Sequence, residues 1–282
     1  GKTLVARGVV ASLLKRRLEC GRAVQPLRVV YICSNQALAQ ENAGKLAVFT
    51  GSEQERWVSS LQFSRLAELG LQQDDPKPGV LMESCSLTPA TSFSLTRGGG
   101  NALERYILWR AVKEARQIQD TEQLEEFFCN GVKGVWEDAR RSCESRELEP
   151  QARAEFIGRL KERPMLDESA RSAAKALQLN LHSYATLIQS LSEAGAEYVR
   201  ATKHGTHLAT CVRGGIRQMF VEACARNLKA DIFILDEFQR FSALLHAGSV
   251  TPDTAAGEDA VSEEQIIARR VLHEGTGYAT LL

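Results

Sequence analysis

Three short apolar runs along the chain predict buried β-strands. Their residues are mainly aliphatic, β-branched or aromatic, and they lie at 28–32, 80–87 and 231–235. A run of this length is typical of a strand covered on both faces, as in a parallel sheet packed between helices. Helices are predicted at 4–19 and 218–228. The pattern therefore predicts an α/β fold with a parallel sheet and helices on both faces.

The middle of the chain has a different pattern, in which apolar positions recur at helical spacing. Leu103, Ile107 and Val112 predict one amphipathic helix. A clearer helix is predicted where the apolar positions keep returning to one face, at Leu177, Leu181, Tyr184, Leu187, Ile188 and Leu191. Helical sequence over 102–198 is far longer than an ordinary crossover between two strands. We therefore predict an inserted helical subdomain at 102–198.

The α/β domain is then expected to form from two separate segments, 1–101 and 199–282. Two adjacent carboxylates, Asp236 and Glu237, follow its last predicted strand. Ligands of open α/β sheets bind at the carboxyl ends of the strands, so this pair is a candidate for holding a metal ion and activating a water. A strand that ends in a solvated acidic turn would have the same sequence.

The first three residues match the end of a phosphate-binding pattern. Gly1, Lys2 and Thr3 fit the last positions of G-x-x-x-x-G-K-[ST], in which the lysine contacts the β and γ phosphates and the hydroxyl ligates Mg²⁺. The predicted helix 4–19 follows at once, as the pattern requires. The upstream half of the pattern is absent, so we expect the chain to begin inside the motif.

These motifs together resemble the first motor domain of superfamily 2, DEAD/DEAH-like helicases. Residues 1–3 are similar to the first motif of that family, and residues 236–239, Asp-Glu-Phe-Gln, to its acidic motif, whose commoner spellings end in Asp or His. The segment 29–35, running into 36–42, is similar to the strand, loop and helix with which the family touches nucleic acid. The resemblance implies a RecA-like P-loop NTPase sheet with a large helical insertion.

The resemblance also implies a nucleotide site that binds ATP and Mg²⁺. Gly1, Lys2 and Thr3 would form one side of it, with Lys2 neutralising the β and γ phosphates and Thr3 ligating the metal ion. Asp236 would hold the same ion through a water. Arginine fingers for this chemistry would come from a second RecA-like domain of the same parent chain.

Two further residues of the acidic motif are expected to act on catalysis. Glu237 would orient and deprotonate the attacking water. Gln239 would sense the nucleotide state across the cleft to the second domain. By this resemblance we expect the chain to be incomplete at both ends of the motor domain. We therefore expect weak ATP binding, negligible turnover and aggregation through exposed strand edges when it is isolated.

Two polar loops are candidates for gripping a nucleic-acid strand by its phosphates. Their side chains can donate hydrogen bonds to phosphate oxygens without reading bases. These residues are Ser34, Asn35, Gln36, Thr88, Thr91 and Ser92. The loop at 34–36 would also serve as an ordinary helix N-cap. The stretch 88–93 resembles bacterial helicases of restriction and phage defence, which implies DNA rather than RNA and a nuclease or methylase subunit as partners.

The overall charge does not indicate a nucleic-acid binder, because 35 basic residues balance 35 acidic ones. Residues 1–32 are nevertheless basic, with seven Lys or Arg and one Glu. The seven cysteines form no C-x-x-C pair, and the sequence shows neither a signal peptide nor an apolar run long enough to span a bilayer. We expect reduced thiols, a cytoplasmic location and no membrane partner.

Two other classes of function remain open at this stage. Another P-loop enzyme, such as a nucleotide kinase, would be expected to have an arginine-rich lid and to lack the Ser-Asn and Thr-Pro loops. A non-enzymatic interaction module would act through the helices at 102–198, with the acidic pair in a structural role. In a helicase, the same helices could clamp nucleic acid, bind a partner or only elaborate the fold.

Overall fold

The computed structural model describes the chain in segments. They are residues 2–20, 25–33, 48–49, 57–60, 65–73, 78–88, 100–119, 122–162 and 203–236, with short helical pieces at 171–172, 174–175, 184, 186, 188–189, 267–268 and 271–272. The chain divides into two compact units. The sheet unit comprises 1–65, 73–94 and 225–282, and the helical unit comprises 66–72 and 95–224.

The helical unit begins and ends outside the range 102–198 that we expected for an insertion. It includes residues 66–72 and the whole of helix α12, Lys203–Cys224. The difference arises because α12 packs on other helices of this unit, among them α8 and α5. The expected helix at 218–228 is the last part of α12 followed by a 3₁₀ turn, η3, at Ala225–Leu228.

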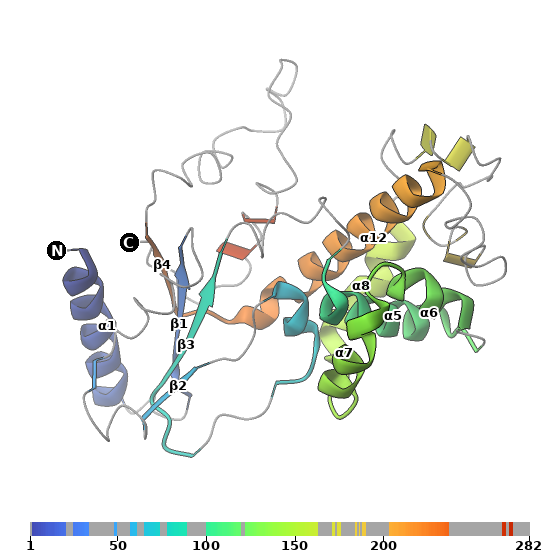
Figure 1. The fold of residues 1–282 in the computed structure, drawn as a ribbon. Helices are drawn as coiled ribbons and strands as arrows, with labels where there is room; N and C mark the ends of the chain where they lie inside the picture. Colours follow the sequence, from blue (N-terminus) through green and yellow to red (C-terminus); the bar gives the residue numbers. More distant parts are fainter. Residues whose placement is uncertain are drawn as a thin grey trace. The chain divides into compact units, whose positions relative to one another are not determined.

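A four-stranded, all-parallel sheet forms the centre of the sheet unit, so the α/β fold class is confirmed at this level (Figure 1). The strand order is β2-β3-β1-β4. The bounds are Leu27–Ile32 for β1, Val58–Ser60 for β2, Met82–Leu87 for β3 and Ile232–Leu235 for β4. Strand β2 was not predicted, because it has three residues and two of them are serines.

Both faces of the sheet are buried, as the apolar runs predicted. Register places Val30 of β1 between Cys85 and Phe233, and all three side chains are buried. The other face carries Val29, beside Ile232 of β4. Continuous burial of this kind removes the alternation of polar and apolar positions that a half-exposed strand would show.

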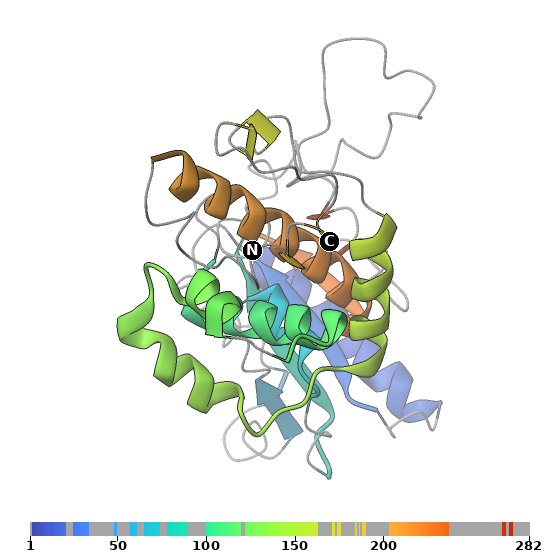
Figure 2. The same cartoon turned by 90° about the vertical axis from the view of Figure 1, so that its right-hand side faces the viewer.

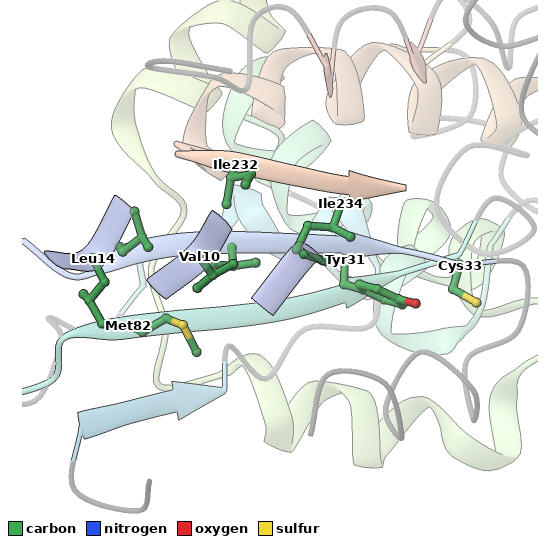
Figure 3. Close-up of a cluster of buried hydrophobic side chains, with 10 residues drawn as sticks. Val10, Leu14, Tyr31, Cys33, Met82, Ile232 and Ile234 are labelled. Atoms are coloured by element: carbon green, nitrogen blue, oxygen red, sulfur yellow. The ribbon is translucent and has the colours of Figure 1, made fainter. Parts of the chain in front are cut away.

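Helix α1, Lys2–Glu19, covers the face of the sheet that carries Val29 and Ile232. Its buried residues Ala6, Val10 and Leu14 recur every four positions, which places them on one side of the helix. Figure 3 shows Val10 and Leu14 against the strands, with Leu14 nearer to the strand beginnings. The predicted helix after the phosphate-loop motif therefore exists and packs on the predicted sheet.

The helical unit is built around α5 and α12. Figures 1 and 2 show α12, in orange, running along α5 and α8. The remaining bounds are Leu66–Gly70 for η1, Ala102–Arg116 for α5, Glu122–Cys129 for α6, Lys133–Val135 for η2, Trp136–Cys143 for α7 and Pro150–Glu162 for α8. The clearer amphipathic helix expected at 177–191 lies largely outside the described residues.

A buried ion pair joins the two main helices of this unit. Arg217 of α12 donates from Nε to Oε1 of Glu104 in α5 at 2.9 Å, and the two side chains are 2% and 1% exposed. Glu104 also completes a capping box at the start of α5: its backbone N–H donates to Asn101 Oδ1 at 2.9 Å, and its Oε2 accepts from the Asn101 N–H. Gly100, at φ +86°, makes the turn into this cap.

Two arginines of the helical unit satisfy carbonyls at the end of α6. Arg105 donates to the Asn130 carbonyl at 2.7 Å, and Arg213 donates to the Phe127 carbonyl at 2.9 Å. Cations near a helix C-terminus stabilise it through its unpaired carbonyls and its dipole. Burial, aided by the nearby charge of Arg105, lowers the pKa of Arg213 to about 10. Arg213 therefore stays charged at neutral pH, and both arginines have a structural role.

All seven cysteines lie among the described residues, and each is a free thiol. No helix in the described part of the chain is both long and apolar enough to cross a membrane.

Candidate functional site

The carboxyl ends of β1, β3 and β4 meet at one edge of the sheet, because these strands are parallel. Two backbone hydrogen bonds continue the ladder past the strand ends. The Cys33 N–H donates to the Leu87 carbonyl at 3.1 Å, and the Asp236 N–H donates to the Ile32 carbonyl at 2.9 Å. Asp236 is therefore held at this edge, which we call the carboxyl edge, beside the end of β1.

The hydroxyl of Tyr31 donates a hydrogen bond to Oδ2 of Asp236. Tyr31 pairs with Ile234 across the sheet, and Asp236 follows two positions later on the same face. The tyrosine is buried, and its ring belongs to the apolar cluster under α1. In Figure 3 the hydroxyl of Tyr31 points along the strands toward their carboxyl ends. The carboxylate of Asp236 is thus oriented by a fixed side chain from the neighbouring strand.

The direction of α1 brings its first turn toward the same edge. Near its C-terminus, Arg17 contacts Asp231 at the start of β4 with two hydrogen bonds, of 2.8 and 3.1 Å. The helix therefore runs antiparallel to β4. From Arg17 back to Thr3 the helix rises about 21 Å, at roughly 1.5 Å per residue. From Asp231 to Asp236 the strand advances about 17 Å.

The helix is about as long as the strand that it covers, so its first turn and Asp236 both lie toward the carboxyl edge. The backbone of Lys2 and Thr3 is helical. The amide groups of a helix N-terminus, together with its dipole, favour an anion. A carboxylate and the start of a helix lying on one edge form an arrangement that suits a phosphate ligand with a bound cation.

The opposite, amino edge of the sheet carries a network of structural ion pairs. Asp231 accepts from Arg17 and from the Arg28 backbone N–H at 2.8 Å. The Arg28 side chain pairs with Glu83 at 2.7 Å and donates to the Leu228 carbonyl at 3.0 Å. These contacts tie α1, β1, β3 and β4 together. Asp231 is therefore a structural carboxylate, although it and Asp236 flank the same strand.

The structure describes some of the sequence-predicted site residues. The side chains of Asp236 and Thr88 are described, and for Lys2 and Thr3 the helical backbone is. The remaining predicted residues lie outside the described parts of the chain: Gly1, Ser34, Asn35, Gln36, Thr91, Ser92, Glu237 and Gln239. The positions of those residues, and hence the expected nucleic-acid contacts of the loop 34–36, stay predictions.

Thr88 directly follows β3 at the carboxyl edge and is 4% exposed. We predicted that it would contact nucleic acid, because the segment 88–93 resembles a strand-contacting loop of the helicase family. The nucleic-acid contact expected of Thr88 stays a prediction. Thr88 and Asp236 both lie at the carboxyl edge.

The donor set at the carboxyl edge fits Mg²⁺. This ion prefers oxygen ligands and is commonly held by one or two carboxylates together with substrate phosphates and waters. Asp236 supplies such a carboxylate, with one oxygen already oriented by Tyr31. Within the described residues, no cluster of three or more His, Cys, Asp or Glu side chains could hold a metal without such a substrate.

The sequence reasoning did not single out Tyr31. The signal was present in the alternation of β1: positions 29, 31 and 33 share one face, as do 232, 234 and 236 of β4. A tyrosine on the same face as an acidic residue, one strand away, is a candidate hydrogen-bond donor. The register that brings them together could be known only from the structure.

Comparisons of the chain with protein-family models, with curated proteins and with solved structures return no match. The class of protein that the fold defines is therefore an α/β protein with a four-stranded parallel sheet and a helical unit.

Proposed function

We propose that this chain carries part of the nucleotide site of a nucleic-acid-dependent ATPase, a helicase or translocase motor of superfamily 2 with a RecA-like fold. The proposal is supported by one observation above others. Helix α1, whose first two residues are Lys2 and Thr3 of the Gly-Lys-Thr sequence, starts toward the same edge of the sheet at which Asp236 follows β4. More than two hundred residues of sequence separate these two elements.

In this proposal the chemistry is mainly positioning and charge stabilisation. Lys2 neutralises the β and γ phosphates, while Thr3 and Asp236 hold Mg²⁺, the ion that stabilises charge on the transferring phosphoryl group. Glu237 activates the attacking water, and Gln239 reports the nucleotide state to a second domain. The strand order is compatible with this fold, because β4, with its acidic motif, lies next to β1.

The nucleic-acid part of the proposal concerns the loops that follow β1 and β3, at 34–36 and 88–92. Both strands end at the carboxyl edge, at which we propose the nucleotide site. A strand of nucleic acid held there would lie close enough to the ATP site to stimulate hydrolysis. We propose DNA as the strand, with a second RecA-like domain and a nuclease or methylase subunit as partners.

The test is ATP turnover by the intact protein, with and without single-stranded DNA or RNA. We expect turnover that nucleic acid stimulates. Glu237→Gln should abolish turnover and retain ATP binding, whereas Lys2→Ala should abolish binding. The matched control is Asp231→Asn. It alters the carboxylate just before β4, at the amino edge of the sheet, and should leave the turnover of folded protein unchanged.

Each result separates the proposal from its alternatives. Normal turnover in Glu237→Gln, or ATP binding unaffected by Lys2→Ala, would refute the assignment of this site. Turnover that ignores nucleic acid and instead transfers phosphate to a small acceptor would favour a kinase. An intact protein that neither binds nor hydrolyses ATP would leave the helical unit as the functional part.

A further inference from the structure

We propose that Tyr31 is a positioning residue of the nucleotide site, which holds Asp236 in the orientation needed to bind Mg²⁺. This inference rests on the proposed function, since it assigns Asp236 to the metal. It adds a residue from β1 that belongs to neither of the two segments, 1–3 and 236–239, through which the chain resembles the nucleotide site of helicases.

The first step concerns how firmly Tyr31 itself is held. It lies in β1, which has β3 on one side and β4 on the other. Its side chain is 4% exposed and belongs to the cluster that includes Val10 of α1 and Ile234 of β4. Figure 3 shows the ring lying along the strands near Ile234. A ring packed in this way has little freedom to turn.

The second step concerns what the hydroxyl does to the carboxylate. The Tyr31 hydroxyl donates to Oδ2 of Asp236, which is the first residue after β4. An ionised carboxylate has about four lone-pair sites, so it can accept from the Tyr31 hydroxyl and from a metal-bound water at the same time. The hydrogen bond therefore orients the Asp236 carboxylate and is compatible with its accepting a hydrogen bond from a metal-bound water.

The third step is the consequence for the metal. Groups that hydrogen-bond a metal-binding side chain fix its orientation, and their loss typically weakens metal affinity by about 10- to 100-fold. Because Asp236 is expected to bind Mg²⁺ through water, we expect an effect near the lower end of that range. Tyr31 should thus affect the dependence on Mg²⁺ more than the affinity for ATP at saturating Mg²⁺.

A purely structural role gives a different expectation. A buried tyrosine hydroxyl needs some acceptor, and Asp236 would then be only the nearest one. In that case Tyr31→Phe would lower the stability of the fold and leave the Mg²⁺ dependence of the folded protein unchanged. The two roles are therefore separated by a metal titration and are not separated by a stability measurement alone.

The experiment compares the intact wild-type protein with Tyr31→Phe, which keeps the ring and removes only the hydroxyl. The control is Tyr106→Phe, which removes the same group from a buried tyrosine of α5. Binding of a fluorescent ATP analogue is titrated with Mg²⁺. We expect the half-saturating Mg²⁺ concentration to rise about tenfold in Tyr31→Phe and to stay unchanged in the control.

A double variant guards against a general loss of structure. If Tyr31 acts through Asp236, adding Tyr31→Phe to Asp236→Asn should produce no further change in the Mg²⁺ dependence. Wild-type Mg²⁺ dependence in Tyr31→Phe, or an equal further loss in the double variant, would overturn the inference and leave the proposed function intact. A wild-type protein that binds no ATP at all would instead overturn the proposed function, and the inference with it.

Discussion

The buried ion pair between Glu104 and Arg217 offers the sharpest stability prediction. Glu104→Gln keeps the size of the side chain, and glutamine can keep the capping-box contact to the Asn101 backbone. The substitution therefore removes mainly one charge. Arg217 would then remain buried, 2% exposed, after losing the carboxylate that pairs with it at 2.8 Å.

The magnitude follows from this burial. Removing one partner of a buried ion pair typically costs about 3–5 kcal/mol. Arg217 has further contacts, so we expect a loss near the lower value, about 3 kcal/mol. For an exposed pair the cost is small: Arg141 and Asp138 in α7 are 68% and 71% exposed, and Asp138→Asn should change the free energy of unfolding by less than about 1 kcal/mol.

The assay is urea unfolding followed by far-UV circular dichroism, which reports the helical unit. With a urea dependence of about 2–3 kcal/mol per molar, Glu104→Gln should lower the midpoint by about 1 M. Adding Arg217→Met to Glu104→Gln should recover part of the loss, because the unpaired charge is removed. A midpoint shift no larger than that of Asp138→Asn would refute the reasoning from burial.

Three other predictions concern stability and pH. Burial raises the pKa of the Cys85 thiol to about 12 from 9.0, against the opposing charge of Arg28. The unfolded thiol therefore loses its proton first, and the free energy of unfolding should fall between about pH 9 and 12 by up to about 1.4 kcal/mol per pH unit. Cys85→Ala should lessen this slope, measured by urea unfolding at several pH values. An unchanged slope would contradict the role of Cys85. Arg17→Met, which breaks the contact with Asp231, should cost about 2 kcal/mol in thermal or urea unfolding and leave ATP affinity unchanged. Arg110→Lys should destabilise the helical unit by about 1–2 kcal/mol, because Arg110 donates to the carbonyls of Cys143 and Arg146, at and just after the end of α7, at 2.8 and 2.6 Å. Equal urea midpoints for the variant and the wild type would contradict this role.

The sequence was most informative where local pattern and burial agree. The run Ile232–Leu235 is apolar at every position, and the structure makes it a strand buried on both faces. Helix α1 and strand β1 were likewise predicted within two residues at either end. In these elements the apolar periodicity follows directly from the surface that each must bury.

The sequence was less informative where tertiary contacts decide. Helix α12 begins at Lys203, well before the predicted start at 218, although Gly205, Gly214 and Gly215 lie within it and lower its intrinsic helix propensity. Its packing on α5 and α8 outweighs that cost. The hydrogen bond from Tyr31 to Asp236 depends on strand register, which joins residues 205 positions apart and has no local signature.

The central claim is that the start of α1 and the end of β4 surround one metal–nucleotide complex. Affinity cleavage tests it most directly: Fe²⁺ replaces Mg²⁺ with ATP in the intact protein, and ascorbate with peroxide cuts the backbone close to the metal. We expect cuts near Thr3 and near Asp236, suppressed by excess Mg²⁺ and ATP, and none at Asp231 on the amino edge. Cleavage at only one of the two segments, or at neither while ATP remains bound, would contradict the claim.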